Sequence, residues 1–335
     1  MISKLNPSNF TRKQLIYAGI IGGIGITALA LGKSHFNGGV CKIKKDLTGK
    51  VIVITGSNTG IGKETARALA AMNATIILAC RDSKRTLPVV AELKTQTHNQ
   101  NVEYMHLDLT DLASIRSFAT NFKSKYDRLD ILINNAGVMM IPTRQLTKDG
   151  FEMQFGTNHV GHFLLTKLLI DVIKASAPSR IINLSSMVHI NGKMNWGDLM
   201  SMNNYDPMQA YFQSKLANVI FSKELQRRMD LENVDVKVVS VHPGVVRTEL
   251  SRYVLEQTWW NILLKLVSPI VYYTTKNSKQ GAQTSLYCAL EEHGKLKGGE
   301  YYSDCKVAPV NPLALEDGAG TKLWQATETF IAEQP

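Results

Sequence analysis

Six short apolar runs rich in β-branched residues alternate with longer amphipathic segments, and no other feature of this 335-residue chain constrains its fold as strongly. Strands that are apolar along their whole length are typical of a parallel sheet with both faces covered by helices. The predicted strands are residues 51–55, 75–80, 102–107, 131–134, 181–185 and 236–241. The predicted helices are residues 62–72, 84–97, 111–126, 150–175 and 209–230.

Right-handed connections between such strands predict a doubly wound, Rossmann-like α/β sheet. Residues 46–335 show no internal repeat and no low-complexity tract, so we predict that they form a single domain. In folds of this class, ligands bind at the carboxyl ends of the strands. Functional residues are therefore expected directly after the predicted strands.

The N-terminal residues 14–32 form a run without any charge, flanked by basic residues on both sides. As a helix the run would span about 28 Å, close to the roughly 30 Å hydrocarbon core of a bilayer. We predict that residues 1–45 form an uncleaved membrane-anchor helix with a basic linker. The alternative is a cleaved signal peptide, because residues 28–30 (Ala-Leu-Ala) resemble a cleavage site.

The net charge of +10 is concentrated near the N-terminus, where residues 1–50 hold eight basic residues and one acid. A nearly neutral body predicts no nucleic-acid groove, whereas basic residues beside an apolar run suit a membrane surface. The four cysteines lack the spacing of a metal site or a disulfide framework, so we predict reduced thiols and no metal.

The first predicted strand runs into a glycine-rich turn, residues 55–62 (TGSNTGIG), and a helical pattern follows at once. Glycines there let the backbone turn tightly and approach a pyrophosphate, while the helix N-terminus supplies aligned N–H groups. The spacing excludes a P-loop, because five residues rather than four separate Gly56 from Gly62, and Glu64 stands where a Ser or Thr would hold magnesium. We predict a dinucleotide-binding turn.

The spacing of this turn resembles the short-chain dehydrogenase/reductase family, and further family motifs follow in the family's order over residues 48–310. These are Asn134-Asn135-Ala136-Gly137 after the fourth strand, Ser185-Ser186 after the fifth, Tyr211-x-x-x-Lys215, and Pro243-Gly244 with Thr248 after the sixth. Phrases such as NNAGVM, FGTNHVGHFLLT and HPGVVRTEL resemble the membrane-anchored retinol dehydrogenases of the 11–14 type, and are most similar to member 13.

The resemblance implies an NADP(H)-dependent catalytic domain over residues 46–335. The cofactor residues that it implies are Gly56, Ser57, Asn58, Thr59, Gly60, Ile61, Gly62, Arg81, Asp108, Asn135, Ala136, Gly137, Tyr211, Lys215, Pro243, Gly244 and Thr248. The residues after the second predicted strand, where the adenosine ribose is expected, do not decide between NAD and NADP by themselves. Arg81 suits the 2′-phosphate of NADP, but Asp82 follows it, and both could belong to a solvated turn.

Hydride transfer to a carbonyl requires a proton donor, and Tyr211 is the predicted general acid. Lys215 lies four residues later on the same helical face, so we predict that its ammonium group lowers the pKa of Tyr211. The resemblance implies the other roles. Lys215 also binds the nicotinamide ribose, Ser186 binds the substrate oxygen, and Asn158 holds a water that links Lys215 to solvent.

His159 and His162 are predicted to pack or to form hydrogen bonds, because no third ligand has the spacing of a metal site. Residues 250–278 interrupt the alternation of strands and helices and are rich in aromatic residues. The resemblance implies that they form a lid. Either an interfacial segment facing the bilayer or an ordinary lid packed on its own domain fits this composition.

The leading hypothesis is an NADP-dependent enzyme that interconverts retinal and retinol in a membrane. The resemblance places it in the endoplasmic reticulum or the mitochondrial inner membrane, and leaves a homodimer open. One alternative keeps the reaction but changes the substrate to other lipid aldehydes, steroids or quinones. A second alternative is a non-catalytic nucleotide-binding membrane protein.

Overall fold

A computed structural model of the chain describes residues 37–247 and 275–334. Its eight-stranded sheet has the order β3-β2-β1-β4-β5-β6-β7-β8, with parallel neighbours except for the antiparallel pair β7 and β8. The strands are β1 (Val51–Thr55), β2 (Thr75–Cys80), β3 (Val102–His106), β4 (Ile131–Asn134), β5 (Ser179–Leu184), β6 (Val236–His242), β7 (Tyr301–Ser303) and β8 (Lys306–Val307).

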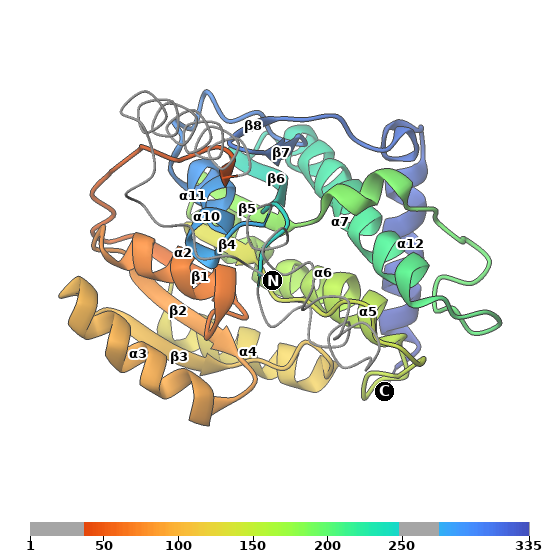
Figure 1. Cartoon of the computed structure of the whole chain (residues 1–335), viewed down its shortest axis with the longest axis horizontal. Coiled ribbons are helices and arrows are strands. Elements are labelled where there is room, and N and C mark those ends of the chain that lie inside the picture. Colours follow the sequence, from red (N-terminus) through yellow and green to blue (C-terminus); the bar gives the residue numbers. More distant parts are fainter. Residues whose placement is uncertain (1–36, 248–274, 335) are drawn as a thin grey trace, which may run out of the picture.

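Helices cover both faces of the sheet (Figure 1). They are α2 (Gly60–Ala70), α3 (Ser83–Thr97), α4 (Leu112–Lys125), α5 (Met153–Phe155), α6 (Gly161–Ala175), α7 (Pro207–Leu231), α10 (Ser278–Gly281), α11 (Gln283–Leu290) and α12 (Ala319–Ala332). The predicted doubly wound parallel sheet is confirmed. The strand order changes direction between β1 and β4, which is where such sheets bind ligands.

The apolar side chains of each strand are shared between two hydrophobic cores, one on each face of the sheet. On β1, Val53 belongs to the core under α4, α6 and α7, whereas its neighbour Ile54 belongs to the core under α2, α3 and α11. Successive side chains of a strand point to opposite faces, so a strand buried on both faces must be apolar at every position. This is why the strands were visible in the sequence.

The six predicted strands and most of the predicted helices form with boundaries shifted by a few residues. The predicted helix 150–175 is instead three pieces, α5, a π-helical turn at Gly156–Val160 and α6. The sequence pattern missed β7 and β8, which are only three and two residues long, and the helices after residue 275.

Three predictions fall outside the described residues. They concern the anchor within residues 1–36, Thr248, and residues 250–274 of the lid. Within residues 37–247 and 275–334, no helix is both long enough and apolar enough to cross a membrane.

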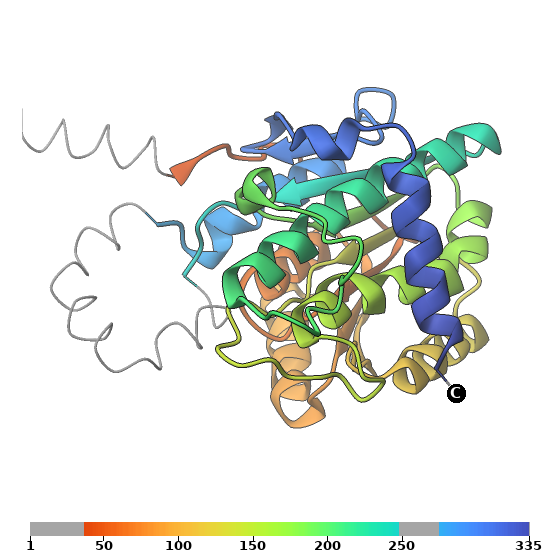
Figure 2. The same cartoon turned by 90° about the vertical axis from the view of Figure 1, so that its right-hand side faces the viewer.

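The described chain begins against the C-terminal part of the domain. Gln280 Nε2 donates to Asn37 Oδ1 at 2.7 Å, and the Cys41 N–H donates to Gln283 Oε1 at 3.0 Å. Figure 2 shows this first segment, in orange-red, beside the blue helices α10 and α11. The N-terminal segment is therefore fixed to the body from residue 37 onward.

Candidate active site

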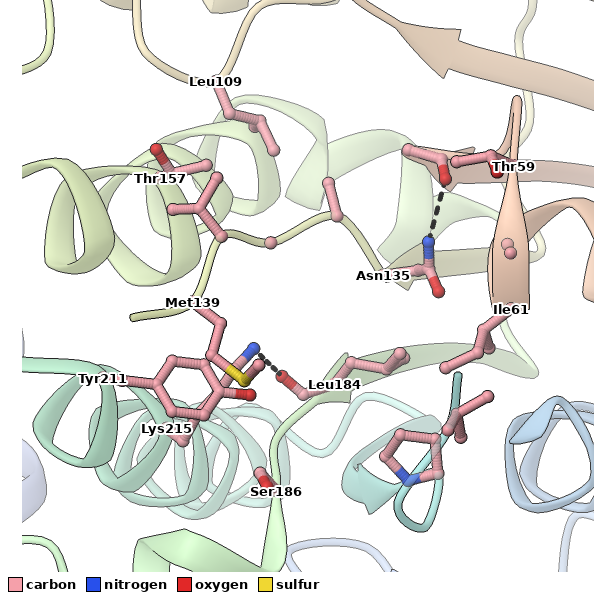
Figure 3. Close-up of a pocket in the computed structure, with 18 of the residues that line it drawn as sticks. Thr59, Ile61, Leu109, Asn135, Met139, Thr157, Leu184, Ser186, Tyr211 and Lys215 are labelled. Carbon is pink, nitrogen blue, oxygen red and sulfur yellow. Dashed lines mark hydrogen bonds between the residues drawn. The ribbon is translucent and has the colours of Figure 1, made fainter. Parts of the chain in front are cut away.

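A cleft of about 680 Å³ lies at the carboxyl ends of strands β1 to β6 (Figure 3). Sixteen of the predicted site residues line it: Gly56, Asn58, Thr59, Gly60, Ile61, Gly62, Arg81, Asp108, Asn135, Ala136, Gly137, Ser186, Tyr211, Lys215, Pro243 and Gly244. Ser57 and Asn158 lie behind this lining, and both are fully buried. The fold thus gathers residues from six separate strand ends into one cleft.

The glycine-rich turn has the backbone that only glycine adopts easily. Gly56 and Gly60 have φ angles of +62° and +59°. A Cβ on Gly62 would lie 2.5 Å from Asn135 Nδ2 and 2.7 Å from the Gly56 carbonyl oxygen, closer than any side chain can approach. The helix α2 begins at Gly60, so its first N–H groups face the cleft, where an anion would be stabilised.

Hydrogen bonds join the turn to the end of β4. Thr55 Oγ1 accepts from the N–H groups of Asn135 and Ala136, both at 2.9 Å, and Asn135 Nδ2 donates to the Thr55 carbonyl oxygen at 2.7 Å. Ser57 faces the interior, where its hydroxyl donates to the Ile54 carbonyl oxygen at 2.8 Å. Ser57 therefore holds the shape of the turn from behind.

At the far end of the cleft, Arg81, Asp82 and Arg85 follow β2. Asp82 Oδ1 accepts from the Arg85 N–H at 3.1 Å and so caps α3. Asp82 thus caps a helix, and like Arg81 it also lines the cleft. Asp108, on the neighbouring strand end, accepts from the N–H and the hydroxyl of Thr110 at 3.0 and 2.7 Å.

Tyr211 and Lys215 lie one turn apart on α7, across from Ser186 at the end of β5 (Figure 3). The Lys215 Nζ is 5.7 Å from the centre of the Tyr211 ring and donates to the Leu184 carbonyl oxygen at 3.2 Å. The Ser186 hydroxyl lies near enough to the Tyr211 phenol to act against the rise in its pKa. A donor, an acid and an ammonium group thus share one end of the cleft.

Burial is the largest cause of the pKa shifts of Tyr211 and Lys215. Burial raises the pKa of Tyr211 to about 12, against the opposing effect of the hydrogen bond with Ser186, and it lowers the pKa of Lys215 to about 8. The prediction that Lys215 holds the pKa of Tyr211 below its usual value is therefore wrong for this structure. The reason is that desolvation of the phenolate outweighs the other effects.

Asn158 lies in the π-helical turn, at the middle of the predicted helix 150–175. Its Oδ1 accepts from the Val138 N–H at 2.9 Å, and its Nδ2 donates to the Val138 carbonyl at 2.9 Å and to Ser214 Oγ at 3.0 Å. A Cβ on Gly137 would lie 3.1 Å from Asn158 Oδ1 and 3.5 Å from Lys215 Nζ, so the three residues meet. The implied role in holding a water stays a prediction.

The prediction that the two histidines near Asn158 form hydrogen bonds is confirmed. His162 lies between Thr55 Oγ1 at 2.9 Å and the Asn158 carbonyl oxygen at 3.0 Å. His159 Nε2 is 3.1 Å from Thr327 Oγ1 on α12. Burial lowers the pKa of His159 to about 3 and that of His162 to about 4, so both rings are neutral at pH 7.

Sequence reasoning missed four methionines that line the cleft, namely Met139, Met140, Met153 and Met187. Met139 and Tyr211 both line this cleft and are labelled in Figure 3. Met140 has a φ of +54°, a conformation that L-residues rarely adopt, and its N–H donates to the buried Gln154 Oε1 at 2.8 Å. The four come from three separate segments, so no sequence pattern links them.

Comparison with known proteins places this geometry in a family. A short chain dehydrogenase family model matches residues 50–259. The chain is 47% identical to retinol dehydrogenase 12 of Homo sapiens over 295 residues, covering 88% of this chain and 90% of that protein. It is 44% identical to retinol dehydrogenase 13 of Homo sapiens over 307 residues, covering 91% of each.

Solved structures agree with the sequence comparison. An uncharacterized protein from Mycobacterium paratuberculosis has a TM-score of 0.70 and 33% identity, covering 88% of this chain and 97% of that one. A short chain dehydrogenase from Escherichia coli CFT073, solved in complex with NADPH, shares the fold with a TM-score of 0.58 and 22% identity, over 78% of this chain and 99% of that one. The chain thus belongs to the short-chain dehydrogenase/reductase family and is an oxidoreductase related to the retinol dehydrogenases of the 11–14 group.

Proposed function

We propose that the protein is an NADP(H)-dependent oxidoreductase that interconverts retinal and retinol, or a similar lipophilic aldehyde and alcohol, by hydride transfer. One observation carries this proposal. Ser186, Tyr211 and Lys215 share one end of a cleft whose lining also includes the glycine-rich turn and Arg81. A cofactor bound along the cleft would supply the hydride beside a proton donor.

The residues of the cleft fit the phosphate groups of a nicotinamide dinucleotide. The glycine-rich turn lines the cleft with Gly56, Gly60 and Gly62, and the N-terminus of α2 offers N–H groups there. Arg81 and Arg85 stand together after β2, while the carboxylate of Asp82 is engaged by the N–H of α3. The guanidinium of Arg81 in the lining supports the 2′-phosphate of NADP over the bare ribose of NAD.

In the reductive direction Ser186 would donate a hydrogen bond to the substrate oxygen, and Tyr211 would donate its proton to the developing alkoxide. With a pKa of about 12 for Tyr211, the phenol is fully protonated at pH 7. With a pKa of about 8 for Lys215, most of the ammonium is retained at that pH. In this protonation state Tyr211 carries the proton that it would donate in carbonyl reduction.

The methionines in the lining of the cleft suit an apolar substrate. Unbranched thioether side chains adapt to different shapes, so Met139, Met140, Met153 and Met187 can pack against a long hydrocarbon. The relatives named retinol dehydrogenase support a retinoid. The same adaptability leaves other lipid aldehydes, steroids and quinones as the alternative substrate class.

The proposed setting is a membrane. It rests on the uncharged run at residues 14–32 and on the basic residues around it. The organelle and the homodimer stay predictions.

The test is to mix full-length protein in detergent with NADPH and a panel of carbonyl compounds, and to follow cofactor oxidation by absorbance. We expect oxidation with all-trans-retinal and a slower reaction with NADH. Faster turnover of a steroid or a quinone than of retinal would assign the alternative substrate class. NADPH binding without turnover of any carbonyl would contradict the proposed reaction and favour the nucleotide-binding alternative.

A further inference from the structure

Ser186 is followed by a 3₁₀ helix, Met187–Asn191, that brings Met187 and Val188 to the cleft wall. A 3₁₀ helix this short leaves most of its carbonyl groups without partners of its own. The position of Ser186 therefore depends on what satisfies those carbonyls. In this protein the main partner comes from more than a hundred residues away in the sequence.

Asn311, in the segment between β8 and α12, supplies that partner. Its Nδ2 lies 3.1, 2.8 and 2.9 Å from the carbonyl oxygens of His189, Ile190 and Gly192. Its Oδ1 accepts from the Leu313 N–H at 2.9 Å, which fixes the amide in this orientation. Asn311 is buried, so water does not compete for these carbonyls.

The segment that Asn311 contacts, residues 189–192, packs against α7, the helix that carries Tyr211 and Lys215. A Cβ on Gly192 would lie 2.9 Å from the Phe212 carbonyl oxygen and 3.0 Å from Leu216 Cβ. Phe212 and Leu216 are the residues directly after Tyr211 and Lys215. Holding the Gly192 carbonyl therefore fixes the 3₁₀ helix at a set distance from the predicted acid.

His189 makes a second connection on the same segment. Its Nδ1 lies 2.7 Å from the Ser186 carbonyl oxygen, and because a carbonyl only accepts, the ring N–H donates. The ring packs against Tyr301 of β7, with 4.4 Å between the ring centres. The backbone of Ser186 is thus tied through His189 to the same C-terminal part of the chain that carries Asn311.

We propose that Asn311 is a positioning residue for Ser186, acting by clamping the carbonyls of residues 189, 190 and 192 so that the Ser186 hydroxyl stays aligned with Tyr211. The effect on turnover rests on the proposed function, whereas the clamp itself does not. A displacement of about 1 Å between reacting groups can slow an enzyme on the order of a hundredfold. The loss of the clamp is therefore expected to reduce kcat without affecting the cofactor end of the cleft.

The experiment uses the full-length protein with Asn311→Leu, a nearly isosteric change that removes the amide without adding charge. The matched control is Asn99→Leu. Asn99 is buried to a similar degree, 6% exposed against 7% for Asn311, and its Nδ2 also donates to two carbonyl oxygens, at 2.9 and 2.8 Å, but it lies away from the cleft. Both variants lose buried amide hydrogen bonds, so both should lose similar thermal stability.

Two readouts separate positioning from stability. Hydrogen–deuterium exchange of residues 186–192 should increase in Asn311→Leu and not in Asn99→Leu. The kcat for retinal reduction should fall about tenfold or more in Asn311→Leu, with the NADPH dissociation constant unchanged within about twofold. If Asn311→Leu does not fold, Asn311→Ala, which removes the same amide without filling its place, is expected to show the same fall in kcat relative to Asn99→Ala.

Unchanged exchange in residues 186–192, or equal kcat in Asn311→Leu and Asn99→Leu, would overturn the clamp. In the fallback case, equal kcat in Asn311→Ala and Asn99→Ala would overturn it. A wild-type protein that reduces no carbonyl compound would instead reject the proposed function, and the exchange measurement would still decide the clamp.

Discussion

The Lys215 ammonium donates a hydrogen bond to the carbonyl oxygen of Leu184, 3.2 Å away, and so joins the helix of Tyr211 to the strand end that precedes Ser186. Two further bonds strengthen this junction. Asn218 Nδ2 donates to the same oxygen at 3.1 Å, and Ser185 Oγ donates to the Lys215 carbonyl oxygen at 2.7 Å. These side-chain-to-backbone bonds hold the end of β5 against α7, and so contribute to the relative position of Ser186 and Tyr211.

Lys215 should lower the stability of the protein near neutral pH. Burial lowers the pKa of Lys215 from 10.5 to about 8. Each pKa unit corresponds to about 1.4 kcal/mol, so keeping this buried group charged costs on the order of 3 kcal/mol below pH 8. Between pH 8 and 10 the unfolded chain binds more protons at this lysine than the folded chain, so this contribution makes stability rise with pH.

Lys215→Met should therefore melt at a higher temperature than the wild type at pH 7. The difference should narrow as the pH rises from 8 to 10, and carbonyl reduction should be lost. The Leu184 carbonyl keeps Asn218 as its donor in the variant. Thermal melts across this pH range provide the measurement, with Lys223→Met, a partly exposed site on the same helix, as the control. A variant that melts below the wild type at pH 7 would contradict the expected cost.

Tyr211→Phe should remove the proton donor while leaving the glycine-rich turn intact. Acid–base groups usually contribute on the order of 10²- to 10⁴-fold to turnover, so we expect a fall of at least about a hundredfold. NADPH binding, measured by fluorescence, should persist. Tyr287→Phe on α11, which does not line the cleft, should retain activity. Near-normal turnover in Tyr211→Phe would show that another group supplies the proton.

Arg81→Ala should weaken the binding of NADPH more than that of NADH. Only NADPH carries the 2′-phosphate, and a hydrogen bond to a charged group contributes on the order of 1.5–3 kcal/mol, or roughly 10- to 100-fold in affinity. Binding titrations with both cofactors provide the measurement. Arg116→Ala, an exposed site on α4, is the control and should bind both cofactors like the wild type. Equal losses for the two cofactors would give Arg81 a structural role instead.

Deletion of residues 2–36 should release the protein from membranes. The deletion removes the uncharged run but keeps the contacts of Asn37 with Gln280 and of Cys41 with Gln283, so the domain should remain folded. The remaining basic residues give only salt-sensitive attachment. A carbonate or high-salt wash should then extract the truncated protein, while the full-length protein resists. A full-length protein whose N-terminus begins near Leu31 would instead establish signal cleavage.

Much of the fold could be read from the sequence because its signals are local. A strand buried on both faces must be apolar at every position, as in β1. The turn after it requires glycine at the positive φ angles of Gly56 and Gly60. These requirements act within a few residues of the chain, so the positions of the strands along the sequence and the glycine-rich turn could be predicted.

Only the tertiary structure decided how distant residues act on one another. The rise in the pKa of Tyr211 follows from its burial by surrounding elements, which the spacing to Lys215 does not reveal. The methionines of the cleft and the contact of Asn311 with the turn after Ser186 likewise join segments far apart in the chain. The burial of one polar side chain and such long-range contacts depend on which elements pack together, and the local sequence pattern does not specify that.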